Sequence, residues 1–110
     1  MFEKDLKIAY LLDFYGDVLT ERKKEVLDMY YNEDLSLAEI AEQIGISRQG
    51  VRDLIKKAED EIYFLEEKLS FAKKMSDLRR HTDNMMSIAE STEIPYNLKS
   101  EIEEISKTIK

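Results

Sequence analysis

Basic side chains gather on one short segment of an otherwise acidic chain. The 110 residues include 17 basic and 24 acidic side chains, for a formal net charge of −7. Residues 45–58 depart from this balance, because four basic residues accompany a single acidic one, Asp53, for a net charge of +3. The four basic residues are Arg48, Arg52, Lys56 and Lys57. This segment is therefore the first candidate for contact with phosphates, although the acidic surroundings would weaken nonspecific binding to a polyanion.

The residues around the basic segment have the spacing of two helices joined by a tight turn. Ser36 can cap a helix, and Glu39 can complete a capping box. Gly45 stands where a short turn requires a positive φ, and Ser47 can cap the next helix. Apolar residues follow helical periodicity at Leu37, Ile40, Ala41 and Ile44, and again at Val51, Leu54, Ile55 and Ala58. The spacing predicts a helix-turn-helix with its basic residues and Gln49 on the exposed face, against the alternative of two core helices with an ordinary turn.

Composition predicts a compact, all-α protein. Hydrophobic residues make up 43% of the chain and charged residues 37%, with only 3 Gly and 1 Pro. Before the motif, we expect a helix over 3–15 that ends at Gly16, and a second helix over 21–31 that Thr20 caps and Asn32 ends. These helices would pack on the motif and complete a helix-turn-helix domain over residues 1–69.

Residues 70–110 carry two amphipathic stripes that need a partner. One has the four-and-three spacing of a coiled-coil seam, at Phe71, Met75, Leu78, Thr82, Met85 and Ala89. The other stripe belongs to a helix with Pro95 near its first turn, at Ile94, Leu98, Ile102, Ile105 and Ile109. One helix over 48–90 would be about 63 Å long, so we expect a break near Ser70 or Ser76. The stripes predict an arm, part of the same compact unit, that forms a homodimer through Phe71, Met75, Leu78, Met85, Ile102 and Ile105; an intramolecular hairpin is the alternative.

Several classes of site are not expected. Without Cys, and with His81 as the only His, the chain offers no thiolate or histidine cluster for a metal, and we expect no cofactor. It has no Gly-rich phosphate loop and no nucleophile elbow, so we do not expect an enzyme. The absence of a secretory signal and of a long apolar run predicts a soluble, cytoplasmic protein that does not bind membranes. The basic residues near His81 are interpreted as a solvated helix face rather than as a second phosphate site.

Two family resemblances extend these predictions. Residues 19–69, with Leu19–Leu27, Leu35–Ala41 and Ile46–Val51 as the matching stretches, resemble the promoter-binding fourth region of bacterial sigma factors. The whole chain, including Lys7–Gly16, resembles the YlxM family of helix-turn-helix proteins from low-GC Gram-positive bacteria. That resemblance implies a gene beside that of the signal recognition particle (SRP) GTPase and a regulatory role in SRP-dependent targeting. It also implies DNA as the partner, with the SRP GTPase or the SRP RNA as the alternative.

The resemblance to sigma region four also implies roles for individual residues. Arg48, Gln49 and Arg52 would approach base edges in the major groove, Lys56 and Lys57 would approach phosphates, and the helix start at Ser47 would hold a further phosphate. The sequence departs from the sigma pattern after Ala58, where Glu59, Asp60 and Glu61 replace the usual basic residues. We expect these three carboxylates to face any phosphate backbone that lies along the helix.

Overall fold

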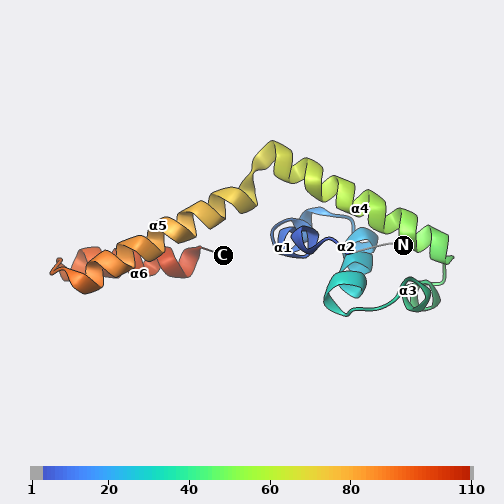
Figure 1. Ribbon diagram of the computed structural model, residues 1–110, viewed down its shortest axis with the longest axis horizontal. Coiled ribbons are helices and arrows are strands. Elements are labelled where there is room, and N and C mark those ends of the chain that lie inside the picture. The colour runs from blue at the N-terminus through green and yellow to red at the C-terminus, as the bar shows by residue number, and fades with distance from the viewer. Residues whose placement is uncertain (1–3, 110) are drawn as a thin grey trace. The chain divides into compact units, whose positions relative to one another are not determined.

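The computed structural model describes residues 4–109, and within this range the regular structure is helical, with no strand (Figure 1). The α-helices are α1 (Leu6–Tyr15), α2 (Glu21–Leu27), α3 (Leu37–Ile44), α4 (Arg48–Leu69), α5 (Phe71–Ser91) and α6 (Tyr96–Thr108). A 3-10 turn, η1 (Gly16–Val18), follows α1, and a π-helical turn, η2 (Asp28–Asn32), extends α2. The prediction of an all-α fold is confirmed. The chain divides into two compact units, Met1–Leu69 and Ser70–Lys110.

In the first unit, α1, α2 and α3 all pack against α4 (Figure 1). The inward residues of α4 are spaced by four, three and four positions and have no exposed surface: Val51, Ile55, Ala58 and Ile62. Burial of each large aliphatic side chain contributes about 1.5–3 kcal/mol, and the small Ala58 allows a close approach between helices. This packing fixes which face of α4 points to solvent.

The helices before α4 begin and end near their predicted positions. Asp5 caps α1 by accepting a hydrogen bond from the Lys7 amide, 2.9 Å. The predicted start of this helix at residue 3 lies outside the described residues, and α1 ends at Tyr15, directly before Gly16. Thr20 accepts from the Lys23 amide, 3.4 Å, and the helical segment that it begins ends at Asn32. Its last turn is π-helical, which the sequence did not predict.

The second unit is a hairpin in which α5 and α6 pack against each other. The predicted break in the long helix falls at Ser70, which has a left-handed backbone conformation with φ 51°. On α5 the buried residues are small: Ala72, Thr82 and Ala89. Arg79 joins the two helices, because its guanidinium donates to Ser106 Oγ at 3.1 Å and to the Ile109 carbonyl at 2.6 Å. The carbonyl at the end of α6 is thereby satisfied by a positive charge.

Among the described residues, no helix is both long enough and apolar enough to span a membrane.

Candidate nucleic-acid interface

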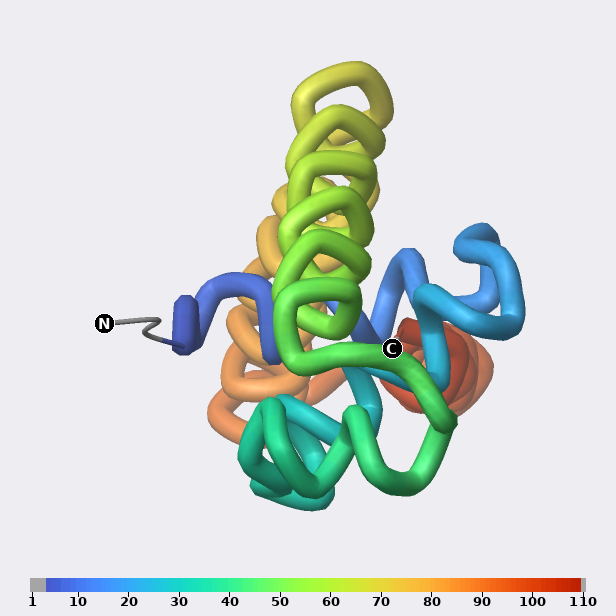
Figure 2. The backbone as a smooth tube through the Cα atoms, turned by 90° about the vertical axis from the view of Figure 1, so that its right-hand side faces the viewer, coloured from blue at the N-terminus to red at the C-terminus, as the bar shows by residue number. Residues whose placement is uncertain are grey.

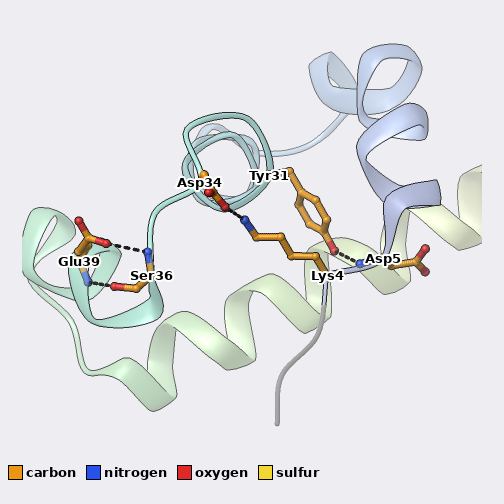
Figure 3. Close-up of polar contacts among 6 residues, drawn as sticks. All are labelled: Lys4, Asp5, Tyr31, Asp34, Ser36 and Glu39. Carbon is orange, nitrogen blue, oxygen red and sulfur yellow. Dashed lines mark hydrogen bonds and ion pairs between the residues drawn. The ribbon is translucent and has the colours of Figure 1, made fainter.

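The helix-turn-helix begins at a complete capping box. The Glu39 amide donates to Ser36 Oγ at 3.1 Å, and the Ser36 amide donates back to Glu39 Oε1 at 3.1 Å (Figure 3). The turn before this cap is tied to the start of the chain, because Lys4 forms an ion pair with Asp34 (Figure 3). Because Ile40 and Ala41 are buried, the capped helix has a fixed position on α4. The predicted cap and its apolar face are confirmed.

Gly45 makes the turn between α3 and α4, which Figure 2 traces in green. It has φ 74° and ψ 34°, and its amide donates to the Ala41 carbonyl at 2.9 Å. A Cβ atom at this position would meet nothing within 4 Å, so the need for glycine comes from the left-handed backbone alone. Ser47 Oγ then accepts from the Gly50 amide at 2.9 Å and caps α4, as predicted.

The side chains predicted to contact nucleic acid lie on the solvent-exposed side of α4. This exposed set consists of Ser47, Arg48, Gln49, Arg52, Lys56 and Lys57. Gln49 donates to Asp53 Oδ1 at 2.9 Å, and the Lys56 ammonium lies 3.2 Å from Asp60 Oδ1. The six residues are therefore accessible to a ligand, and the carboxylates of Asp53 and Asp60 lie among them.

The three carboxylates after Ala58 have different environments, which corrects the expectation that all of them face outward. Glu59 is half-buried and accepts a hydrogen bond from the Tyr31 hydroxyl. Glu61 accepts from the Lys23 ammonium of α2 at 2.9 Å. Asp60 is exposed and pairs with Lys56. The physical reason is helical rotation, because about 100° per residue carries positions 59 and 61 toward the packed side of α4 while position 60 stays outside.

The chain matches a known family over nearly its whole length. A family model described as "Putative helix-turn-helix protein, YlxM / p13 like" matches residues 2–106. The chain belongs to the UPF0122 family. This confirms the resemblance to YlxM, and the family description agrees with the motif built around Gly45.

Several UPF0122 proteins are similar to this chain. One from Clostridium perfringens (strain 13 / Type A) is 40% identical over 103 residues, covering 93% of this chain and 92% of the relative. One from Thermoanaerobacter sp. (strain X514) is 42% identical over 108 residues, covering 94% of this chain and 92% of the relative. One from Caldanaerobacter subterraneus subsp. tengcongensis is 45% identical over 80 residues, covering 73% of this chain and 68% of the relative.

In this UPF0122 chain, hydrogen bonds of tyrosine hydroxyls join α4 to the elements that precede it, and no local sequence pattern predicts them. The Tyr31 hydroxyl donates to Glu59. The same hydroxyl accepts from the Asp5 amide at 3.1 Å (Figure 3). The Tyr63 hydroxyl donates to the Asp5 carboxylate, which lowers the pKa of Asp5 and raises that of Tyr63 to about 12. Burial raises the pKa of Glu59 above its usual value, against the opposing effect of the hydrogen bond from Tyr31. These contacts bind the start of α1 and the π-helical turn to the middle of α4.

The residues predicted for oligomerisation have different environments in the hairpin of this UPF0122 protein. Ile102 is only 7% exposed and packs within the hairpin. Met75 is half-buried. The other four remain exposed, by 37–46%: Phe71, Leu78, Met85 and Ile105. The basic residues near His81 are partly engaged, since Arg79 bonds to α6 while Lys73 and Arg80 pair with Asp77.

Proposed function

We propose that this UPF0122 protein is a regulatory DNA-binding protein that reads duplex DNA with the exposed face of α4. One observation carries the proposal: the six polar and basic residues at the start of α4 lie on its solvent side, while Val51, Ile55 and Ala58 anchor the opposite side in the core. A helix held in this way can enter a major groove without rearrangement of the fold.

Each side chain has a role that matches its chemistry. Arg48 and Arg52 supply guanidinium groups, which bind guanine bidentately, and Gln49 supplies an amide that suits adenine. Lys56 and Lys57 supply ammonium groups for phosphates farther along the helix. Ser47 stands at the start of α4, where backbone amides favour an anion. A role on DNA also implies a cytoplasmic location.

A second candidate function is supported by the charge of the first unit. Residues 1–69 contain 10 basic and 17 acidic side chains, which gives −7, so a long duplex would meet repulsion outside the α4 face. A protein surface or a folded RNA demands less contact with a continuous phosphate backbone. The alternative, implied by the resemblance to YlxM proteins, is an accessory protein of the SRP pathway that contacts the SRP GTPase or the SRP RNA.

Charge reversal on α4 tests the first candidate against the second. Duplexes are first selected from genomic DNA fragments, and total RNA is selected in parallel. We expect Arg52→Glu with Lys56→Glu to abolish duplex binding, because both positions would then repel phosphates. Lys73→Glu with Arg80→Glu on α5 is the matched control, because it makes the same change in net charge on another unit and should preserve DNA binding.

The readouts separate the outcomes. If all four cations of this face, Arg48, Arg52, Lys56 and Lys57, displace counterions, the logarithm of the duplex binding constant should fall against that of the salt concentration with a slope of about −3.6. Failure to bind any duplex at low salt refutes the DNA proposal. Association with the SRP GTPase or the SRP RNA that survives the α4 reversal would support the accessory role instead.

A further inference from the structure

The hairpin of α5 and α6 has one apolar face that nothing in its own unit covers. Leu78 and Met85 are seven positions apart on α5 and are 46% and 37% exposed. Beside them lies a groove of about 400 Å³. Its lining includes Met75, Leu78, Ile105 and Ile109, with Glu101 and Glu104 on the α6 side. The predicted seam is thus divided: Thr82 and Ala89 are used within the hairpin, while Leu78 and Met85 project beside it.

The hairpin buries little apolar surface of its own. Its buried residues on α5 are small, and the chain has no Cys with which to cross-link the two helices. Units of this size usually need a disulfide, a metal or association with another surface to be stable. The exposed face therefore needs an occupant, and charge identifies its chemistry.

The two helices of the hairpin carry opposite net charge. α5 has four basic and three acidic residues, for +1, whereas α6 has two basic and three acidic residues, for −1. The same asymmetry marks the edges of the apolar face. On the side of Leu78 that faces α6, Met75 and Thr82 are half-buried and buried. On its other side, Lys74 and His81 are exposed and form the outer edge of α5. Glu101 and Glu104 are exposed on α6, where Glu104 also forms an ion pair with Lys107 at 3.4 Å.

We propose that this face binds a second copy of the chain, with α5 of each copy against α6 of the other. A two-fold axis parallel to the helices pairs the basic edge of one copy with the acidic edge of the other, which is the complementarity an isologous dimer requires. Two neutral hairpins also meet without net repulsion. The proposal is independent of what α4 binds.

The register within the hairpin fixes which residues meet. The contact between Arg79 and Ser106 shows which residues of the two helices lie at the same height along the hairpin. Because the helices run in opposite directions, Leu78 lies beside residues 105–109 and His81 beside Glu104. A two-fold axis parallel to the helices preserves these levels between copies. Leu78 of each copy enters the groove of its partner, and His81 lies over the acidic edge of that groove.

The mass of the full-length protein in solution tests the dimer. We expect light scattering and sedimentation to give a dimer, and Leu78→Glu to raise its dissociation constant roughly thirtyfold or more, because a charge would enter an apolar groove. Leu6→Glu is the matched control, since Leu6 is 82% exposed on α1, and it should remain dimeric. A monomeric wild type, or a Leu78→Glu variant that stays dimeric with unchanged helicity, overturns the proposal.

A second measurement tests the register at a position where folding is not at risk. With Glu104 of the other copy opposite, His81→Lys should lower the dissociation constant roughly fivefold and His81→Glu should raise it by a similar factor. Asn84→Lys and Asn84→Glu are the controls, because Asn84 is exposed and lies about 200° around α5 from buried Thr82. Equal shifts at both positions, or shifts of the same sign for both His81 variants, refute the arrangement.

Discussion

Replacement of Asp60 by Asn is expected to weaken the fold slightly and to strengthen binding to DNA. The Lys56 ammonium lies 3.2 Å from Asp60 Oδ1, and both side chains are more than 60% exposed. An exposed pair four residues apart on a helix contributes about 0.3–0.5 kcal/mol to stability. Asp60→Asn should therefore lower the free energy of unfolding by about that amount.

The same change strengthens binding to DNA through two contributions, both opposite in direction to its effect on stability. Lys56 no longer has to leave a carboxylate in order to contact a phosphate, which recovers about 0.3–0.5 kcal/mol. Removal of a negative charge about 10 Å from a phosphate adds about 0.4 kcal/mol in water, less the screening by salt. At low salt, where screening is small, these terms together predict a duplex dissociation constant about three- to fivefold lower.

Fluorescence anisotropy with a selected duplex measures the binding term, and urea unfolding measures the stability term. Asp77→Asn is the matched control, because Asp77 also pairs with a lysine four residues away, Lys73 at 3.5 Å, but lies on α5. Because Asp77 also pairs with Arg80, its replacement should lower stability somewhat more, and it should change binding hardly at all. If Asp60→Asn leaves the dissociation constant unchanged, or if Asp77→Asn lowers it equally, then Lys56 is not a phosphate contact.

Three further predictions concern the supports of α4. Gly45→Ala should lower the free energy of unfolding by about 1–2 kcal/mol, because its backbone is left-handed, and Gly45→Asn should lose less; urea midpoints measure both. Ser36→Ala should cost about 0.5–2 kcal/mol by the same assay, through loss of the capping box. Burial raises the pKa of Glu59, so the protonated side chain favours the folded state. This contribution to stability is present below the unfolded pKa and is lost as the pH rises through the folded pKa. Glu59→Gln should therefore raise the urea midpoint at pH 7, and this gain should shrink toward pH 4; equal gains at both pH values would refute the assignment.

The parts of the motif that the sequence predicted depend on contacts within a few residues of one another. Ser36 and Glu39 cap each other across three positions, and Ser47 caps the amide of Gly50 across the same interval. The conformation of Gly45 follows from its own lack of a side chain. Such interactions leave a signature in a short stretch of sequence, so the pattern predicts both their partners and their geometry.

The tyrosine contacts behind α4 could not be predicted in this way. Tyr31 reaches Asp5 and Glu59, which are 26 and 28 residues away along the chain. Its direction is set by the π-helical turn Asp28–Asn32, which shifts the phase of the helix relative to an ordinary 3.6-residue period. A projection that assumes a regular helix therefore assigns Tyr31 to the wrong angle.

The predicted seam on α5 is divided between two environments, which its four-and-three spacing does not distinguish. The expected contact set follows a 3.5-residue repeat, whereas a short straight helix keeps 3.6 residues per turn and drifts away from that repeat. Arg79 adds a specific reason, because the end of α6 needs a donor for the Ile109 carbonyl and the guanidinium supplies it. The face toward α6 is consequently turned toward Arg79, and Leu78 remains at its margin.

The carboxylates that follow Ala58 on α4 affect the fold and the binding of a partner differently. Two of these three carboxylates belong to the scaffold, because Glu59 binds Tyr31 and Glu61 binds Lys23. Their negative charge therefore counts against a phosphate backbone much less than their number suggests, whereas Asp60 acts directly on Lys56. Of the three carboxylates after Ala58, Asp60 would then be the one that weakens binding to nonspecific DNA. A chain in which Asp60→Asn failed to improve that binding would instead require the repulsion to come from the whole acidic unit, which favours a protein or folded RNA partner.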